Sequence, residues 1–235
     1  LLTTDTFAMD RNIGLTAAGG TIETLSATTL TINGIMSGAG GLTKTNTGTL
    51  VLTGENTYTG GTTISGGTLQ LGNGGTSGSL KGNVAIAKDS ALNVNRSDTV
   101  TLDGTISGEG SVSHSGTGTT ILSANNNYTG GTTINSGTLQ IGNGGASGSI
   151  TGNVTNNGAL VFNRTGTAVL NGVISGTGEV RQTGTGITQL TGLNTYTGKT
   201  NVEAGTLAAG GANVLSANSA HSVSSGGTLD LAGYN

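Results

Sequence analysis

Acidic side chains that could serve as a general acid and base are few in this chain and widely spaced. The densest group consists of Asp98, Asp103 and Glu109, with Arg96 close by. Paired carboxylates on either side of a glycosidic bond are the usual equipment for its hydrolysis. This group is therefore the candidate site of a polysaccharide-processing enzyme. A cleft with three or more converging charged groups would support that interpretation.

Metal and cofactor sites have less support in the sequence. The two histidines, His114 and His221, lie far apart along the chain, whereas a metal site needs several converging ligands. Two glycine-rich stretches, Asn73–Gly75 and Asn143–Gly145, look like phosphate-binding loops but lack the Lys-Ser/Thr and the helix that should follow. No Asp follows these glycines, so the calcium-binding nonapeptide is also absent. The sequence predicts no catalytic, metal-binding or cofactor-binding residue.

The composition narrows the class of protein further. Gly accounts for 46 of the 235 residues and charged residues for 8%, while Pro and Cys are absent. Without Pro or a Gly-X-Y period the chain is not collagen-like, and without Cys it has no disulfide framework. The net charge of −3 offers no basic patch for nucleic acid. No apolar run is long enough to span a bilayer.

One sequence unit of about 70 residues recurs along the chain. The stretch Asn-Thr-Tyr-Thr-Gly-Gly-Thr-Thr-Ile at 56–64 returns at 126–134 and, less closely, at 194–202. The second interval is slightly shorter than the first, because Lys88 and Asp89 have no counterpart in the next copy. We expect one β-helical segment over residues 1–235, with a partial copy at 1–37 and copies at 38–107, 108–175 and 176–235.

Comparison of the copies separates a predicted core from a predicted outer surface. Positions that stay apolar in every copy are predicted to face inward, and positions that vary are predicted to face outward. The predicted core positions are Leu69, Leu139 and Leu207; Ile64, Ile134 and Val202; Leu52, Leu122 and Leu190; Ile32, Leu102 and Leu170; Leu42, Val112 and Val180; and Ile22, Leu92, Leu160 and Leu229. The predicted outward positions are Lys44, His114 and Gln182, and Val51, Ile121 and Gln189.

The acidic group varies in the same way. Asn171 replaces Asp103 in the next copy, and Gly166 replaces Asp98. Exposed turn residues change in this manner, so the comparison favours a solvated corner over a hydrolytic site. His114 is likewise predicted to be a surface residue.

Short alternating strands between Gly-rich corners favour an all-β fold, a right-handed parallel β-helix. The 70-residue unit divides into three turns of about 23 residues. Some ten turns at about 4.8 Å each give a rod roughly 50 Å long. Gly supplies positive φ at the corners, and the absence of Pro suits interior strands that need every N–H.

Two side chains recur once per repeat, a tyrosine and an asparagine. The tyrosine is predicted to cover a corner of the core, with a carbohydrate-binding row as the alternative. The asparagine is predicted to satisfy backbone groups of a turn. They are Tyr58, Tyr128 and Tyr196, and Asn56, Asn126 and Asn194.

Thr-x-Thr pairs raise the possibility of an ice-binding surface. Such a surface needs a pair on every turn of one sheet, whereas these recur mainly once per repeat, at corners. The pairs are Thr57/Thr59, Thr117/Thr119, Thr165/Thr167, Thr183/Thr185 and Thr195/Thr197.

The stretch from Gly38 to Gln70 closely resembles the autotransporter-associated β-strand repeat, also called the passenger-associated transport repeat. Its motif GAGGLTKTNTGTLVLTGENTYTGGTTISGGTLQ is matched at 108–140 and, more weakly, at 176–207. The third copy departs at Lys199 and Asn201, where the other copies have Gly and Thr, which predicts a less regular corner.

The resemblance implies a non-enzymatic passenger segment of a type V secreted autotransporter. Such a segment is a surface-exposed stalk that assists translocation and folding and supports adhesion or bacterial aggregation, with links to virulence and biofilm. It implies the surface of a Gram-negative bacterium, reached through the periplasm and outer membrane, where the absence of Cys suits passage of an unfolded chain. A polysaccharide-processing β-helix enzyme and an ice-binding β-solenoid are the alternatives.

The partners implied are a host-cell or bacterial surface ligand, protein or glycan, and weak self-association, with no nucleic acid. The protein's own C-terminal β-barrel translocator would lie outside these residues. Residues 1–5 show no signal peptide and the residues near Asn235 no barrel-like strands, so we expect a fragment of a longer protein.

Overall fold

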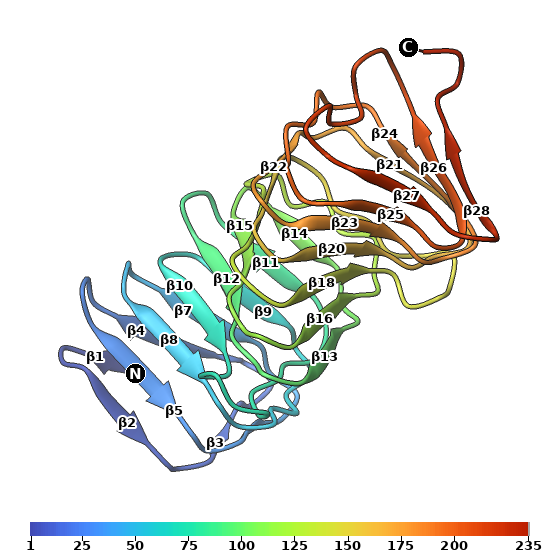
Figure 1. The fold of residues 1–235 in the computed structure, drawn as a ribbon. Helices are drawn as coiled ribbons and strands as arrows, with labels where there is room; N and C mark the ends of the chain where they lie inside the picture. Colours follow the sequence, from blue (N-terminus) through green and yellow to red (C-terminus); the bar gives the residue numbers. More distant parts are fainter. Residues whose placement is uncertain (235) are drawn as a thin grey trace.

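The computed structural model describes residues 1–234, which form a stack of short parallel strands (Figure 1). The two termini lie at opposite ends of an elongated molecule. The described part of the chain contains no helix, and so none that could cross a membrane. This confirms the predicted all-β solenoid of parallel strands.

The chain winds over three faces in a fixed order, which we call faces 1, 2 and 3. Face 1 contains β1 (Leu2–Thr3), β4 (Gly20–Thr24), β7 (Leu42–Thr45), β9 (Thr62–Ile64), β11 (Val84–Ile86), β14 (Ile106–Gly108), β21 (Thr167–Leu170), β24 (Ile187–Leu190), β26 (Gly205–Ala209) and β28 (Gly227–Asp230). Face 2 contains β2 (Phe7–Met9), β5 (Thr29–Ile32), β8 (Thr49–Leu52), β10 (Thr68–Leu71), β12 (Ala91–Val94), β15 (Ser111–His114), β17 (Thr132–Ile134), β19 (Val154–Asn156) and β22 (Ile174–Ser175). Face 3 contains β3 (Ile13–Gly14), β6 (Met36–Ser37), β13 (Thr99–Leu102), β16 (Thr119–Leu122), β18 (Thr138–Ile141), β20 (Ala159–Phe162), β23 (Glu179–Gln182), β25 (Thr200–Val202) and β27 (His221–Val223).

Where a strand is missing from a face, the chain still crosses that face and bonds to the turn before it. The amide of Thr57 donates to the carbonyl of Met36 on face 3, at 2.8 Å. The amide of Asn127 donates to Ile106 on face 1 at 3.0 Å. The winding is therefore continuous through the breaks in the sheets.

The turns are on average shorter than predicted, with paired strands about 20 residues apart. Their length also varies. Thr68 pairs with Thr49 in the turn before it and with Ala91 in the turn after it, and the second interval is the longer one. The corners absorb the difference. About 11 turns at about 4.8 Å give a rod of roughly 50 Å, as expected.

The 70-residue repeat does not correspond to three turns. Three turns from β7 lead through β9 and β11 to β14, all on face 1. The strand equivalent to β7 is the next one, β15, which lies on face 2. One repeat is thus three and one third turns. Each copy of the motif is rotated onto the next face, and the strand equivalent to β7 and β15 in the third copy, β23, lies on face 3.

The core is the predicted column of apolar side chains. The predicted core positions are buried except for Leu229, which is partly exposed on the last turn and packs against the core. Leu92, for example, stacks between Leu69 and Val112 in three successive strands of face 2. Stacked aliphatic side chains of this kind provide most of the favourable free energy of folding.

One set of predicted outward positions is wrong. Lys44, His114 and Gln182 are all buried, with at most 1% of the residue exposed. Lys44 follows Leu42 by two residues, so both side chains point to the same side of the strand. Variation between copies was mistaken for exposure. These side chains vary because the site requires only a polar group that can hydrogen-bond to a corner.

The buried polar groups at this position bond to backbone carbonyls of the adjoining corner. Lys44 Nζ donates to Thr45 O at 2.8 Å and to Asn46 O at 2.7 Å. Gln182 Nε2 donates to Gly184 O at 2.7 Å. In the other predicted outward set Val51 is also buried, at 4% exposure, whereas its two equivalents are half-buried.

Candidate functional site

The predicted acidic group is dispersed over the three corners of the rod. Asp98 follows the face 2 strand β12, Asp103 follows the face 3 strand β13, and Glu109 follows the face 1 strand β14. The chain between the first and the last of them covers more than half a turn. The structure therefore does not assemble them into one acid–base site.

Arg96 and Asp98 have a structural role instead. Arg96 is 6% exposed, and its guanidinium donates to Gly78 O at 2.9 Å and to Thr76 O at 2.5 Å. It also pairs with Asp98 and, at 3.3 Å, with Glu55. The hydrogen bonds from Arg96 hold the pKa of the Asp98 carboxyl below its usual range. The glycine-rich loop that begins at Asn73 is thus anchored by a buried arginine.

The two histidines do not meet. His114 is buried, with Nδ1 3.0 Å from Thr120 Oγ1 and Nε2 3.2 Å from Gly118 O. Burial lowers the pKa of His114, which favours the neutral ring. His221 is exposed on β27, several turns further on. Within residues 1–234, three metal-ligating side chains do not gather anywhere.

The recurring tyrosines are part of the core. All three have no exposed surface, and each hydroxyl bonds to a threonine four residues later, as Tyr58 does to Thr62 at 2.6 Å. Because each repeat rotates by a third of a turn, they occur on three different faces and form no row. The predicted covering of the core is confirmed, and the carbohydrate-binding row is excluded.

The recurring asparagines replace missing strand pairing. Asn56 Oδ1 accepts from the amide of Met36 at 2.8 Å, while Nδ2 donates to Gly54 O and Ser79 O. One side chain thus links three successive turns, and its equivalents do the same. The predicted role in satisfying backbone groups is confirmed. The Thr-x-Thr pairs fall on different faces and corners, so they do not line one sheet.

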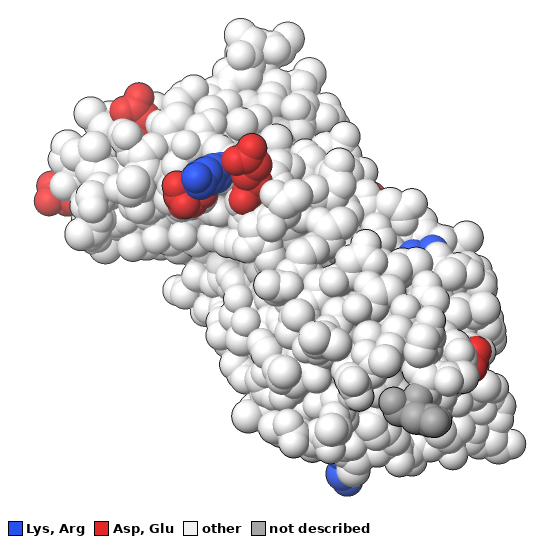
Figure 2. Space-filling view, turned by 90° about the horizontal axis from the view of Figure 1, so that it is seen from above, with Lys and Arg blue, Asp and Glu red and all other residues white. Residues whose placement is uncertain are grey.

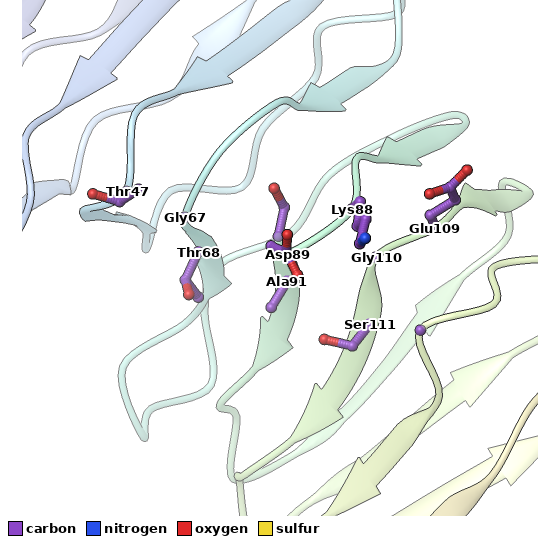
Figure 3. Close-up of a pocket in the computed structure, with 11 residues that line it drawn as sticks. Thr47, Gly67, Thr68, Lys88, Asp89, Ala91, Glu109, Gly110 and Ser111 are labelled. Atoms are coloured by element: carbon purple, nitrogen blue, oxygen red, sulfur yellow. The ribbon is translucent and has the colours of Figure 1, made fainter.

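A groove runs along the corner between faces 1 and 2, and it was not predicted. Its volume is about 520 Å³, and its lining residues come from five successive turns. Figure 3 shows Asp89, Lys88 and Glu109 on neighbouring corners, with the hydroxyls of Thr68 and Ser111 below them. We refer to this feature as the corner groove. Three charged side chains line it, and Glu109 alone among them belongs to the acidic group that the sequence favoured.

The corner groove exists because one corner is longer than its neighbours. The turn from Ala87 to Ser90 is closed by a bond from the Ser90 amide to Ala87 O at 3.1 Å, with Asp89 at φ 61°. Asp tolerates this left-handed conformation better than most residues. The equivalent corner in the next copy has only Asn157 and Gly158. The insertion was visible in the sequence, and its position at a corner was the signal that could have indicated a site.

The charged groups of the corner groove are free to bind a ligand. Lys88, Asp89 and Glu109 are exposed, and none of them forms an ion pair with a described residue. Figure 2 shows how sparse charge is on the face seen from above, where one basic group lies between acidic ones. Ser90 also lines the groove. Its hydroxyl is buried and has no hydrogen-bond partner in the described structure.

Comparison with known proteins agrees with this architecture. The model of the passenger-associated-transport-repeat matches residues 42–71, 115–141 and 180–209. The chain is 42% identical over 197 residues to the adhesin BmaC autotransporter of Brucella suis biovar 1 (strain 1330). That alignment covers 76% of this chain and 6% of the adhesin, so the chain spans a small part of that relative. No solved structure matches the chain significantly.

The fold and the repeats define a β-solenoid of the autotransporter passenger class. The chain carries three passenger-associated transport repeats and is related to an autotransporter adhesin, which confirms the resemblance found in the sequence.

Proposed function

We propose that this chain is a non-enzymatic passenger segment that acts as a stiff stalk and adhesive surface on a Gram-negative bacterium. The observation that supports this most directly is the single uninterrupted core along the rod, together with the relationship to an adhesin. Adhesion would involve a host-cell or bacterial surface ligand. The proposal includes export through the periplasm and the chain's own outer-membrane translocator.

The pairing pattern also supports assistance to translocation. Each described strand bonds to strands about 20 residues away along the chain, so each turn can form on the turn already in place. A chain that emerges gradually from a pore can therefore fold turn by turn, because no contact between its ends is required. Folding outside the membrane would then prevent the chain from slipping back.

The test is to display residues 1–235 on a bacterium that lacks adhesins, fused to a heterologous translocator. We expect more bacteria attached to epithelial cells, or faster sedimentation, than with the translocator alone. Surface display without any gain in attachment or sedimentation would contradict the adhesive role and support only the role as a stalk. Poor display of this chain compared with a globular passenger of equal length would contradict the role in translocation.

The corner groove keeps a polysaccharide-processing enzyme as the second candidate. Two carboxylates and an ammonium group line one groove, and paired carboxylates are the usual equipment for hydrolysis of a glycosidic bond. Incubation with soluble polysaccharides decides between the two. Release of new reducing ends that Glu109→Gln abolishes would identify an enzyme.

A further inference from the structure

The corner groove has the dimensions and the free polar groups of a ligand site. Its volume of about 520 Å³ falls within the range of small-ligand sites. Lining residues from five successive corners, with spacings of about 4.8 Å, give it a length of roughly 19 Å along the rod. A ligand that fits would be extended and parallel to the rod axis.

The accessible polar groups of the groove have no partner in the protein. Lys88, Asp89 and Glu109 form no ion pair with a described residue, and the hydroxyls of Thr68 and Ser111 line the groove beside them. Ser90 also lines the groove, but its unpaired hydroxyl is buried and lies on the same side of the chain as Leu92, so a ligand would not reach it.

The lining excludes an apolar peptide as the ligand. Ala91 is the only apolar residue in the lining, and no aromatic side chain contributes, so the groove has no pocket for a peptide anchor. A peptide cannot add as a strand either, because β10 and β12 are each paired on both sides.

The charges exclude an acidic polymer. Asp89 and Glu109 outnumber Lys88, so an anionic polysaccharide would meet net repulsion. The hydroxyls of Thr68 and Ser111, glycine backbone and two carboxylates suit a ligand rich in hydroxyl groups. A neutral sugar chain meets these requirements.

We propose that the corner groove binds an uncharged oligosaccharide that lies along the rod axis, with Lys88, Asp89 and Glu109 bonded to its hydroxyl or amide groups. This inference rests on the proposed adhesive function and names the class of its ligand. The corner at 157–158 lacks counterparts of Lys88 and Asp89, so that copy has no such site.

The test uses the full chain and four soluble tetrasaccharides: those of N-acetylglucosamine, glucose and mannose, and an acidic one derived from heparin. Binding is followed by NMR shifts of the backbone amides. We expect at least one neutral probe to shift residues 88–90 and 109–111, with no shift there from the heparin probe. Binding of the heparin probe alone, or no shift from any neutral probe at millimolar concentration, would overturn the proposal.

Three variants locate the site. Replacement of residues 87–90 by Asn-Gly copies the corner of the next repeat and should abolish binding while the strands remain. Asp89→Asn and Glu109→Gln should each weaken binding about tenfold with the melting temperature unchanged, because neither carboxylate forms an ion pair with a described residue. Full affinity in all three would contradict the site.

Matched controls lie elsewhere on the rod. Lys81→Gln and Asp103→Asn remove exposed charges from another corner. Thr24→Val removes a buried hydroxyl without a partner, outside the groove. All three should bind the probe normally. If the displayed chain promotes attachment but binds no neutral probe, the proposed ligand class is wrong and the proposed adhesive function is unaffected. If attachment is also absent, the adhesive function and the ligand class are both contradicted.

Discussion

Arg96 and Asp98 form a two-point ion pair, with Nε 2.9 Å from Oδ1 and Nη2 2.8 Å from Oδ2. The next copy contains the same arginine, Arg164, but has Gly166 in place of the aspartate. Arg164 is also buried, at 7% exposure, and its Nε has no partner. Burial without a carboxylate lowers its pKa. One copy of the repeat thus contains a complete arginine anchor and the next an incomplete one.

Gly166→Asp should therefore stabilise the protein. A Cβ built at Gly166 meets nothing closer than 3.5 Å, and the new carboxylate would lie where Asp98 lies in the previous copy. A hydrogen bond to a buried charged group contributes about 1.5 kcal/mol, which corresponds to about 3–6 °C in melting temperature for a chain of this size. Thermal unfolding would measure it. The control is Gly166→Ala, which changes only the backbone entropy; equal stability of the two variants would contradict the pairing.

The buried tyrosines should be the most sensitive positions of the repeat. Tyr128→Phe removes the 2.7 Å bond to Thr132 and leaves that hydroxyl unpaired, at a cost of about 1 kcal/mol. Tyr128→Ala also leaves a cavity and should cost about 3–5 kcal/mol. Urea denaturation of both variants would test this. Tyr234, which is exposed, provides the control, and Tyr234→Ala should unfold like the parent protein.

Alkaline stability should first rise and then fall. Burial lowers the pKa of Lys44 to about 8, below its unfolded value, so the folded state loses its proton first. The unfolded state then binds more protons, and stability rises from about pH 8 to 10. Burial raises the pKa of Tyr58 to about 12, so the unfolded state ionises first and stability falls between about pH 10 and 12.

Two variants separate these effects in denaturation curves measured from pH 7 to 12. Lys44→Gln, which copies Gln182, should remove the rise and keep the fold. Tyr58→Phe should reduce the fall above pH 10. If the stability of the Lys44→Gln variant still rises from about pH 8 to 10, another group titrates in that range.

The pairing register can be tested with cysteines, since the chain has none of its own. Thr133 and Thr155 pair in adjacent strands, and both point outward. The strand spacing of about 4.8 Å is within reach of a disulfide. Thr133→Cys with Thr155→Cys should oxidise readily, whereas Thr133→Cys with Ser175→Cys, two turns apart, should not. The longer, uniform turn expected from the sequence would place Thr133 opposite Asn156 and prevent the first bridge.

The sequence alone determined the strands, the corners and most of the core. These depend on local rules: side chains alternate along a strand, and glycine permits positive φ at a corner. The alternation along the strand already indicated that Lys44, two residues after Leu42, points toward the core. Comparison of the copies obscured it, because a buried position with corner carbonyls accepts Lys, His or Gln equally well.

Only the tertiary structure decided how the repeat relates to the turn. The length of a turn depends on every corner between paired strands, and corners of different length make successive turns unequal, as on either side of Thr68. The sum of these lengths makes one repeat three and one third turns, so Tyr58, Tyr128 and Tyr196 face three directions. It also places the corner of Lys88 and Asp89 beside Glu109 from the next turn. Residues distant in sequence come together because strand pairing, which is non-local, fixes the register.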